Sequence, residues 1–304
     1  MRDLIIIGAG AAGLTAALYA GRFRMDALVL ERLSIGGQIL LSPSIDNYPG
    51  FPEGLNTEEL VSRFKKQVEE VGISIANKDV FEIKKSADGF QVLTSEGNVD
   101  AKSIIISTGA QPKRLDVKGE EKLTGRGVSY CGACDGPLFR DKEIAVIGGG
   151  DRAIEDALFL AGYARKVNLV HRRNELRASK ILVEKAKKNP KINFILESVV
   201  EEIVGESKVE AIKVKNVKTN AESVISCQGV FVFVGIIPNT DFAKKLLDKD
   251  EFGFIITDQE MSTSQGGIFA CGDCRKKSLY QVVTACGEGA TAADSAYKYI
   301  INTK

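Results

Sequence analysis

Leu4-Ile5-Ile6-Ile7-Gly8-Ala9-Gly10-Ala11-Ala12-Gly13 lies at the start of the chain and decides its fold. The apolar run predicts a strand buried on both faces, and a Gly-x-Gly-x-x-Gly loop follows it at once. Region 14–22 has helical apolar spacing, and region 26–30 predicts a second strand ending in Glu31. In such a unit the glycines permit a tight turn and let a pyrophosphate approach the helix N-terminus. The stretch therefore predicts a dinucleotide-binding unit.

The same pattern occurs again near the middle of the chain. Region 143–147 predicts a strand, Gly148-Gly149-Gly150-Asp151-Arg152-Ala153 a second phosphate loop, and regions 154–162 and 167–170 a helix and a strand. Glu31 follows Gly8 by 23 positions, and His171 follows Gly148 by 23 positions. One nucleotide-binding unit is therefore expected twice.

The residue that ends the second strand differs between the copies. The carboxylate of Glu31 suits free ribose hydroxyls and repels a 2′-phosphate. The second copy has His171-Arg172-Arg173, with Arg177 one helical turn further on, and arginines bind a phosphate dianion through charge-assisted hydrogen bonds. We expect FAD or NAD in the first copy and NADP(H) in the second, unless the basic cluster is merely a solvated edge.

Just before the second fingerprint stands Tyr130-Cys131-Gly132-Ala133-Cys134-Asp135-Gly136. A Cys-x-x-Cys spacing lets the two sulfurs meet within one helical turn and close a disulfide with little backbone movement. The first turn of a helix also lowers a thiol pKa, which favours the reactive thiolate. The segment predicts a dithiol that exchanges two electrons.

Bulk properties restrict the class of protein. A length of 304 residues favours two domains, and a net charge of +1 gives no basic excess for nucleic acid and no charged tail. No apolar run approaches membrane-spanning length, and none resembles a signal-peptide core. We therefore expect a cytoplasmic protein, in which a Cys-x-x-Cys pair is catalytic or metal-binding rather than structural.

The only histidine is His171. A Ser-His-Asp triad would have to be built on it, and metal sites with several histidines are excluded.

Each half of the chain looks like a nucleotide fold with an inserted antiparallel β-meander, which makes the fold class α/β. The first half has a Pro/Gly-rich loop at 42–56, a helix at 57–71, alternating stretches at 80–83 and 90–94, and a buried strand at 103–106 that ends near Gly109. The second half has alternating strands over 199–217 and a buried strand at 229–234 before Gly235 and Ile236. A last strand enters Gly272-Asp273, and a helix over 281–296 offers another N-terminus for pyrophosphate or a flavin carbonyl.

Cys271 and Cys274 form a second Cys-x-x-Cys. Zinc held by both pairs is one interpretation, although 137 residues separate Cys134 from Cys271 and the second pair lies in the Gly-Asp turn. A second redox pair is another. Cys227 and Cys286 are expected to be small core residues.

Over essentially its whole length the chain resembles the low-molecular-weight, flavin-dependent thioredoxin reductases. The resemblance is carried by Gly8–Gly13, Gly36-Gly37-Gln38, Cys131–Gly136, Gly148–Ala153, His171-Arg172-Arg173 with Arg177, and Gly272-Asp273. It implies two Rossmann-like domains: a FAD-binding domain of residues 1–113 with 241–304, and an NADPH-binding domain of residues 114–240 that carries the redox cysteines. Crossing segments are expected near 111–119 and 238–250.

The resemblance also implies cofactor contacts. FAD contacts are expected at Gly8, Gly10, Ala11, Ala12, Gly13, Glu31, Arg32, Gly36, Gly37, Gln38, Asn47, Val80, Thr108, Gly109, Gly272, Asp273, Gln281 and Val282. NADPH contacts are expected at Gly148, Gly150, Asp151, Arg152, Ala153, His171, Arg172, Arg173, Arg177, Gly235 and Ile236. No metal is expected.

Three redox roles follow from the resemblance. Cys134 would face the flavin, Cys131 would attack the disulfide of a substrate protein, and Asp135 would shuttle protons. The implied activity is NADPH-dependent reduction of thioredoxin or a similar dithiol protein, by a homodimer. Since nicotinamide, disulfide and substrate protein cannot all be served by one rigid arrangement, we expect the second domain to rotate between half-reactions.

Two positions depart from the family pattern. Arg152 stands where relatives have a small hydroxyl residue, and Tyr280 stands where they have an arginine. The extra cation at Arg152 could strengthen pyrophosphate binding or obstruct it.

Three other functions are compatible with parts of the sequence. A ferredoxin-type donor would leave the arginine cluster unexplained, and so would a flavin-dependent dithiol oxidase. A nucleotide-sensing binding module would leave Cys131 and Cys134 without a purpose.

Overall fold

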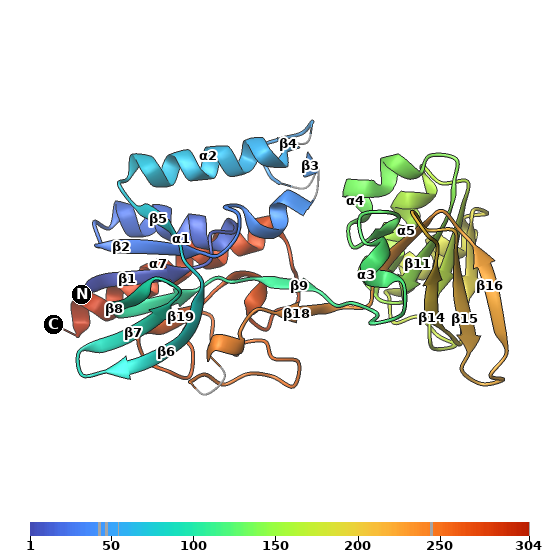
Figure 1. The fold of residues 1–304 in the computed structure, drawn as a ribbon. Helices are drawn as coiled ribbons and strands as arrows, with labels where there is room; N and C mark the ends of the chain where they lie inside the picture. Colours follow the sequence, from blue (N-terminus) through green and yellow to red (C-terminus); the bar gives the residue numbers. More distant parts are fainter. Residues whose placement is uncertain (42–43, 46–47, 54, 244–245, 304) are drawn as a thin grey trace. The chain divides into compact units, whose positions relative to one another are not determined.

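The computed structural model describes residues 1–41, 44–45, 48–53, 55–243 and 246–303, and their side chains except those at positions 41, 44, 133 and 134. The chain divides into two compact units, and Figure 1 labels many of their helices and strands. Unit 1 comprises Met1–Gln111 and Ile237–Lys304, and unit 2 comprises Pro112–Ile236.

Unit 1 is built on a sheet with parallel strands at its centre. Five strands run parallel in the spatial order β5 (Ser74–Asn77), β2 (Ala27–Glu31), β1 (Arg2–Ile7), β8 (Gly97–Ile106) and β19 (Ile268–Ala270). The side chains of Leu4–Ile7 are all buried, because elements cover both faces of this sheet.

The antiparallel insertion of unit 1 shares the long strand β8. Its first half pairs with β7 (Gly89–Thr94), which pairs with β6 (Val80–Ser86). Its second half lies between β1 and β19. One strand therefore joins the meander to the nucleotide-binding sheet.

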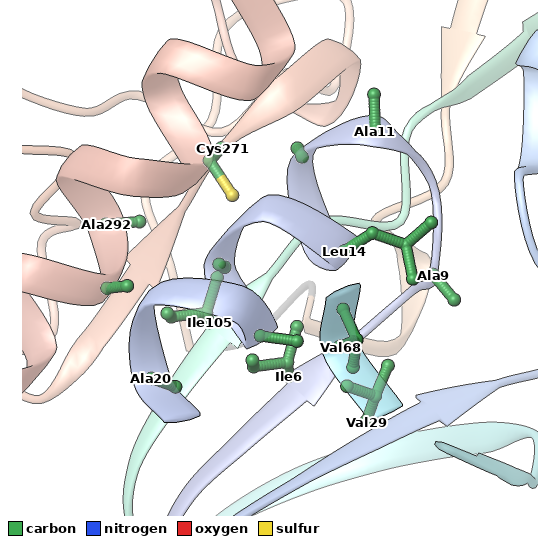
Figure 2. Packing of buried hydrophobic residues seen from close by; sticks show 14 of the residues in the cluster. Ile6, Ala9, Ala11, Leu14, Ala20, Val29, Val68, Ile105, Cys271 and Ala292 are labelled. Atoms are coloured by element: carbon green, nitrogen blue, oxygen red, sulfur yellow. The ribbon is translucent and has the colours of Figure 1, made fainter. Parts of the chain in front are cut away.

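One face of the sheet is covered by α1 (Ala11–Arg22), α2 (Thr57–Glu70) and α7 (Val282–Asn302). Figure 2 shows Ile6, Val29 and Ile105 of the strands packed against these helices. The other face packs on the β6–β7 hairpin and on residues around Ala243 and Ile255.

Helix α1 begins at Ala11, three residues earlier than its apolar periodicity predicts. The last three residues of the glycine loop already form the first helical turn, and their N–H groups are the donors that a helix start leaves unpaired. The remaining short elements of unit 1 are η1 (Gly37–Leu41), β3 (Ser44–Ile45), β4 (Leu55–Asn56), η3 (Asp241–Ala243) and η4 (Gly272–Cys274).

The chain passes between the units twice. The two passages, β9 (Ala110–Pro112) and β18 (Ile236–Pro238), pair with each other as a two-stranded sheet.

Unit 2 repeats the architecture of unit 1. Its parallel strands have the spatial order β10 (Val128–Ser129), β17 (Gly229–Phe233), β11 (Glu143–Gly148), β12 (Lys166–Val170) and β13 (Ile192–Ile195). Helices α5 (Asp151–Ala161) and α6 (Lys180–Lys188) pack on one face.

The antiparallel strands β14 (Ser198–Val204), β15 (Ala211–Asn216) and β16 (Glu222–Ser226) form the meander of unit 2. Together with Leu123 and Val128, their inward side chains form a second core against the other face of the parallel sheet. Short helical segments complete the unit: α3 (Glu120–Leu123), α4 (Gly132–Asp135) and η2 (Gly136–Phe139).

The two copies of the fingerprint occupy equivalent places, β1–α1–β2 in unit 1 and β11–α5–β12 in unit 2. The predicted α/β class, with two Rossmann-like units and a meander in each, is therefore confirmed. Among the described residues, no helix combines the length and the apolar content needed to cross a membrane.

Close packing of α1 on α7 depends on Gly289. A Cβ at this position would lie 2.2 Å from the carbonyl oxygen of Ala12. Gly289→Ala should force the helices apart and lower the free energy of unfolding by about 1–3 kcal/mol.

Gly287 on the same helix is the matched control, because a Cβ there meets nothing within 4 Å. Gly287→Ala should be neutral or stabilising by up to about 1 kcal/mol, since alanine favours helix more than glycine does. Urea unfolding followed by far-UV circular dichroism measures both, and equal midpoints for the two variants would contradict this account.

Candidate functional site

The first phosphate loop is shaped by backbone contacts that only glycine permits. Gly8 has φ +104°, and a Cβ there would lie 2.5 Å from the carbonyl oxygen of Ser107. A Cβ on Gly13 would lie 1.8 Å from the carbonyl oxygen of Gly8. The N-cap of α1 is Gly10, which has no side chain to cap the helix, so no side-chain hydrogen bond satisfies the first-turn N–H groups. This end of α1 suits a pyrophosphate.

Glu31 stands at the end of β2 and is fixed by two backbone amides. Its Oε2 accepts from the N–H of Ala9 at 2.7 Å, and its Oε1 accepts from the N–H of Leu33 at 2.9 Å. The carboxylate thereby ties the phosphate loop to the strand end. Each oxygen keeps a further lone pair that can accept from a ribose hydroxyl. Arg32 follows it and is exposed.

Three further segments of unit 1 reach the same loop. The N–H of Gly36 donates to the carbonyl of Ala9 at 2.8 Å, and a Cβ on Gly37 would lie 3.8 Å from the Cα of Gly10. A Cβ on Gly109 would lie 3.5 Å from Nε2 of Gln38. The Gly36–Gln38 segment and Gly109 thus border the phosphate loop.

Thr108 is held by Asn239, a partner that the sequence did not suggest. The hydroxyl of Thr108 donates to the carbonyl of Asn239 at 2.6 Å, and Nδ2 of Asn239 donates to the carbonyl of Thr108 at 3.0 Å. Val80, at the start of β6, is half-buried. Asn47 lies outside the described residues.

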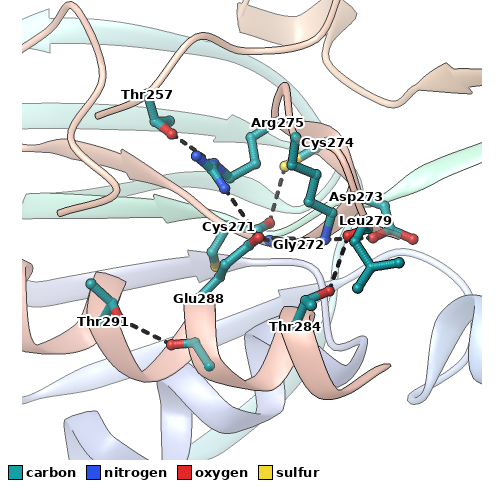
Figure 3. Close-up of polar contacts among 12 residues, drawn as sticks. Thr257, Cys271, Gly272, Asp273, Cys274, Arg275, Leu279, Thr284, Glu288 and Thr291 are labelled. Carbon is teal, nitrogen blue, oxygen red and sulfur yellow. Dashed lines mark hydrogen bonds and ion pairs between the residues drawn. The ribbon is translucent and has the colours of Figure 1, made fainter. Parts of the chain in front are cut away.

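The Gly272-Asp273 turn lies against the first turn of α1. Gly272 has φ +75°, and a Cβ there would lie 2.9 Å from Cβ of Ala12. The N–H of Gly272 donates to Oε2 of Glu288 at 2.8 Å, and Arg275 pairs with Oε1 of the same carboxylate at 3.0 Å (Figure 3). A salt-bridged carboxylate on α7 therefore holds this turn in place.

One carboxylate oxygen of Asp273, Oδ1, accepts no hydrogen bond from the described residues. This atom lies 2.9 Å from Nζ of Lys277, but without hydrogen-bond alignment to any described donor. Tyr280 lies beside Lys277, whose Nζ is 5.5 Å from the ring centroid. Gln281 caps α7 through a reciprocal pair of hydrogen bonds with Thr284, and Val282 starts the helix.

Taken together, these features of unit 1 fit a flavin dinucleotide. They offer bare helix N–H groups for the pyrophosphate, a fixed carboxylate for ribose hydroxyls, and a second helix start at α7.

The second phosphate loop repeats the first with open space at Gly150. A Cβ on Gly150 meets nothing within 4 Å, and α5 has no side-chain cap. Gly148 packs tightly, since a Cβ there would lie 2.7 Å from Cβ of Ala153.

Asp151 accepts from the N–H of Ser179 at 2.6 Å and so fixes the segment that follows the basic cluster. Gly235, with φ +130°, is also open to solvent, and Ile236 begins β18.

The basic cluster lies beside this second loop. Arg172, Arg173 and Arg177 are exposed, and none has an ion-pair partner among the described residues. The N–H of Arg177 donates to the carbonyl of Gly149 at 2.7 Å, which brings the cluster onto the loop. These cations suit a phosphate dianion at the end of β12.

His171 is buried against Gly149, where a Cβ would lie 2.3 Å from Nδ1 of the ring. Burial and the nearby Arg177 lower the pKa of His171, so the ring is neutral at pH 7. Its Nε2 is buried without a hydrogen-bond partner among the described residues.

Arg152 occupies the first turn of α5 and touches three groups. Its guanidinium lies over the ring of Phe233 at 5.6 Å, donates to the carbonyl of Tyr130 at 3.5 Å and pairs with Asp156 at 3.8 Å. Arg152 therefore contacts both the segment that precedes Cys131 and the second turn of its own helix.

We call Cys131–Asp135 the redox turn. Cys131 is disulfide-bonded, and Ser129 brackets it by accepting from its N–H and donating to its carbonyl, both at 3.1 Å. The N–H of Asp135 donates to the same carbonyl at 3.3 Å, which closes the turn. The side chain of Cys134 lies outside the described residues.

The residue before the turn is anchored by a carboxylate that sequence reasoning missed. Tyr130 donates to Oε1 of Glu120 at 2.8 Å, and burial together with this hydrogen bond raises the pKa of Tyr130 to about 12. Glu120 also accepts from the N–H groups of Leu115 and Asp116. No motif of the sequence marks Glu120, although Leu115 and Asp116 lie only five and four positions before it.

The second Cys-x-x-Cys has a different environment. Cys271 and Cys274 are fully buried free thiols, and Cys274 donates to the carbonyls of Cys271 and Ile106. Within the described part of the chain, no three His, Cys, Asp or Glu side chains gather as a metal site requires. Cys227 is buried, as the sequence predicts. Cys286 is half-buried, and its sulfur accepts a hydrogen bond from the hydroxyl of Tyr48.

Two nucleotide-binding units, one of which carries a Cys-x-x-Cys turn, define an oxidoreductase that couples nicotinamide nucleotides to disulfides. The family model described as pyridine nucleotide-disulphide oxidoreductase matches residues 2–289. The chain belongs to this family and, within it, to the thioredoxin reductases, as the following relatives show. The thioredoxin reductase of Peptoclostridium acidaminophilum is 44% identical over 304 residues, which cover 98% of this chain and 96% of the relative.

Solved structures agree. That of Lactococcus lactis thioredoxin reductase has a TM-score of 0.87 and 44% identity, and covers 99% of this chain and 100% of the other. A Mycobacterium leprae relative described as bifunctional thioredoxin reductase/thioredoxin is 39% identical over 302 residues, which are 99% of this chain and 66% of the relative. The chain is thus a flavoprotein oxidoreductase, and the predicted family and enzyme class are confirmed.

The thiols of Cys271 and Cys274 should be unreactive in the native protein. Burial raises the pKa of Cys274 to about 11 and that of Cys271 well above its usual value, so both stay protonated at pH 8. Iodoacetamide at pH 8, followed by peptide mass spectrometry, should label neither residue until the protein is unfolded. Labelling of the native protein at the unfolded rate would instead support a second redox pair.

Proposed function

We propose that the chain reduces the disulfide of thioredoxin, or of a similar small dithiol protein, with NADPH as electron donor and FAD as bound cofactor. The observation that carries the proposal is the contrast between two equivalent nucleotide sites. One ends in the anchored carboxylate of Glu31, the other in the unpaired cations Arg172, Arg173 and Arg177. The cationic site lies in the unit that also contains the disulfide-bonded Cys131.

Unit 1 would bind the flavin nucleotide. The first turn of α1 would donate N–H groups to the pyrophosphate, and Glu31 would accept from the adenosine ribose. The Gly36–Gln38 segment, Thr108 and Gly109 border this loop, and the open Oδ1 of Asp273 can accept a further hydroxyl. Bound FAD supplies the transfer of an electron pair from nicotinamide to disulfide.

Unit 2 would bind NADPH. The open loop at Gly150 would receive the pyrophosphate, and the arginine cluster the 2′-phosphate. Buried Nε2 of His171 offers an acceptor for a ligand hydrogen, because the neutral ring carries one donor and one acceptor.

The redox turn would perform thiol–disulfide exchange. In the proposal Cys134 receives the electron pair, Cys131 attacks the substrate disulfide, and Asp135 moves the protons. The attack forms a mixed disulfide, and the second enzyme thiol then releases the substrate as a dithiol and restores the enzyme disulfide. Leu138, three residues after Asp135, is 67% exposed and supports docking of a protein rather than of a small thiol.

Rotation of unit 2 between half-reactions is part of the proposal. The chain passes from one unit to the other at β9 and β18, and two short strands are a suitable hinge for rigid-body motion. A homodimer in the cytoplasm is proposed from family membership. Light scattering after size-exclusion chromatography tests the dimer, and cell fractionation tests the location.

A ferredoxin-type donor or a dithiol oxidase remains the alternative. Neither would use the unpaired arginines beside the second loop, so their effect on donor choice discriminates among the three.

Titration of the purified protein with NADPH and then NADH tests the cofactor and the donor together. A yellow chromophore should bleach preferentially with NADPH. The double substitution Arg172→Gln and Arg173→Gln should raise the KM for NADPH by roughly 30-fold, because charged hydrogen bonds to phosphate contribute about 2 kcal/mol to binding. The KM for NADH should be nearly unaffected. Absence of flavin, or an unchanged preference, would contradict the proposal.

Restricting motion between the units should separate the half-reactions. A lysine-reactive cross-link that joins unit 1 to unit 2, identified by peptide mapping, should preserve one half-reaction in single-turnover experiments and abolish steady-state turnover. Cys131→Ser is the comparison, since it should keep flavin reduction and lose thioredoxin reduction without restricting motion. Full turnover in the cross-linked protein would rule out the rotation.

A further inference from the structure

A carboxylate outside every motif of the sequence lies against the redox turn. Asp156 is on the second turn of α5, and α4 packs against this helix. A Cβ on Gly132 would lie 2.4 Å from Oδ1 of Asp156. The missing side chain at Gly132 is therefore what lets the carboxylate reach the backbone between the two cysteines.

The surroundings of Asp156 disfavour its charge. Its side chain is 20% exposed, and its one ion-pair partner among the described residues is Arg152, with Nε 3.8 Å from Oδ2. Burial raises the pKa of Asp156 to about 6, Arg152 opposes this shift, and Glu155 adds to it. From the turn packed against α5, the titratable residues are Cys131, Cys134 and Asp135.

We propose that Asp156 is a positioning residue of the redox turn, whose ionisation controls how readily Cys131 forms a thiolate. An ionised carboxylate beside the turn repels a second negative charge, whereas a protonated one does not. The inference rests on the proposed function, because it takes Cys131 and Cys134 as the pair that carries electrons.

The chemistry balances with the electron donor already named. A hydride from reduced nicotinamide supplies two electrons and one proton, and solvent supplies one further proton, so the S–S bond breaks and two S–H bonds form. Loss of one proton from Cys131 to solvent then gives the attacking thiolate. While Asp156 is ionised, loss of the proton from Cys131 is disfavoured. Protonation of Asp156 removes this effect.

Arg152 connects this control to the nucleotide site. It stands on the first turn of α5, where the open loop at Gly150 would hold pyrophosphate, and it is the cation that favours ionised Asp156. Removal of its charge should therefore raise the pKa of Asp156 further.

The test measures the alkylation of Cys131 in the flavin-loaded full-length protein. Cys134→Ser in every variant leaves Cys131 as a free thiol, and iodoacetamide rates at its peptide are followed by mass spectrometry between about pH 5 and 9. The ratio of the Asp156→Asn rate to the parent rate should be about 1 at pH 5. It should rise to roughly tenfold at pH 8, because one like charge shifts a neighbouring pKa by about one unit.

Three variants give matched controls. Glu155→Gln, on the exposed side of α5, should keep a break in the pH profile of the Cys131 alkylation rate and move it slightly to lower pH, because Glu155 adds to the raised pKa of Asp156. Asp156→Glu retains a titratable carboxyl and should also keep a break. Arg152→Gln should move the break to higher pH. If Asp156→Asn folds poorly, Gly132→Ala displaces the carboxylate and should give the same loss of the break.

Each outcome decides one claim. A ratio that is flat with pH overturns the role of Asp156. The proposed function is judged separately in protein with both cysteines present, where NADPH must make Cys131 accessible to alkylation. If NADPH does not make Cys131 accessible in that protein, the proposed function is contradicted, whatever the pH profile of the Cys134→Ser variants shows.

Discussion

Both nucleotide sites depend on a helix that starts without a side-chain cap. In α1 the N-cap is Gly10 and in α5 it is Gly150, and neither supplies a hydrogen bond to the first turn. The unpaired N–H groups and the helix dipole stabilise an anion there by about 0.3–2 kcal/mol. Because a parallel strand leads into each helix and another leaves it, the end of the second strand is brought beside the anion. In the proposed function, the residue at that strand end would select which nucleotide is bound.

Unit 1 strengthens its first loop with a polar network from the far end of the chain. Glu288 of α7 accepts from the N–H of Gly272 and from Arg275, and Lys277 lies 3.5 Å from the same carboxylate. These side chains are shielded from solvent, so their mutual attraction is little weakened by water. The network fixes the Gly-Asp turn against Ala12, while close contact at Gly289 fixes the helix that carries Glu288.

The two Cys-x-x-Cys segments show that spacing alone does not define a redox centre. Cys131 stands at the start of a helical turn, is only partly buried and is disulfide-bonded. Cys271 and Cys274 have the same spacing, but burial among apolar side chains raises their pKa and keeps them protonated. Thiolate formation needs solvent or a nearby positive charge, and Cys131 is the cysteine of these segments that is described as partly exposed to solvent.

Short-range patterns in the sequence were sufficient for the duplicated Rossmann-like fold, the inserted meanders, the family and the main features of both loops. Strand and helix periodicities, glycine spacing and the contrast between Glu31 and the arginine cluster are all local. The tertiary structure alone decided the partners of Asp156, Glu288 and Asn239. Each of these residues contacts partners that only the packing of sheets and helices brings close. Asp156 reaches the backbone at Gly132 because glycine has no side chain there. Such contacts depend on shape and burial, which no local stretch of sequence encodes.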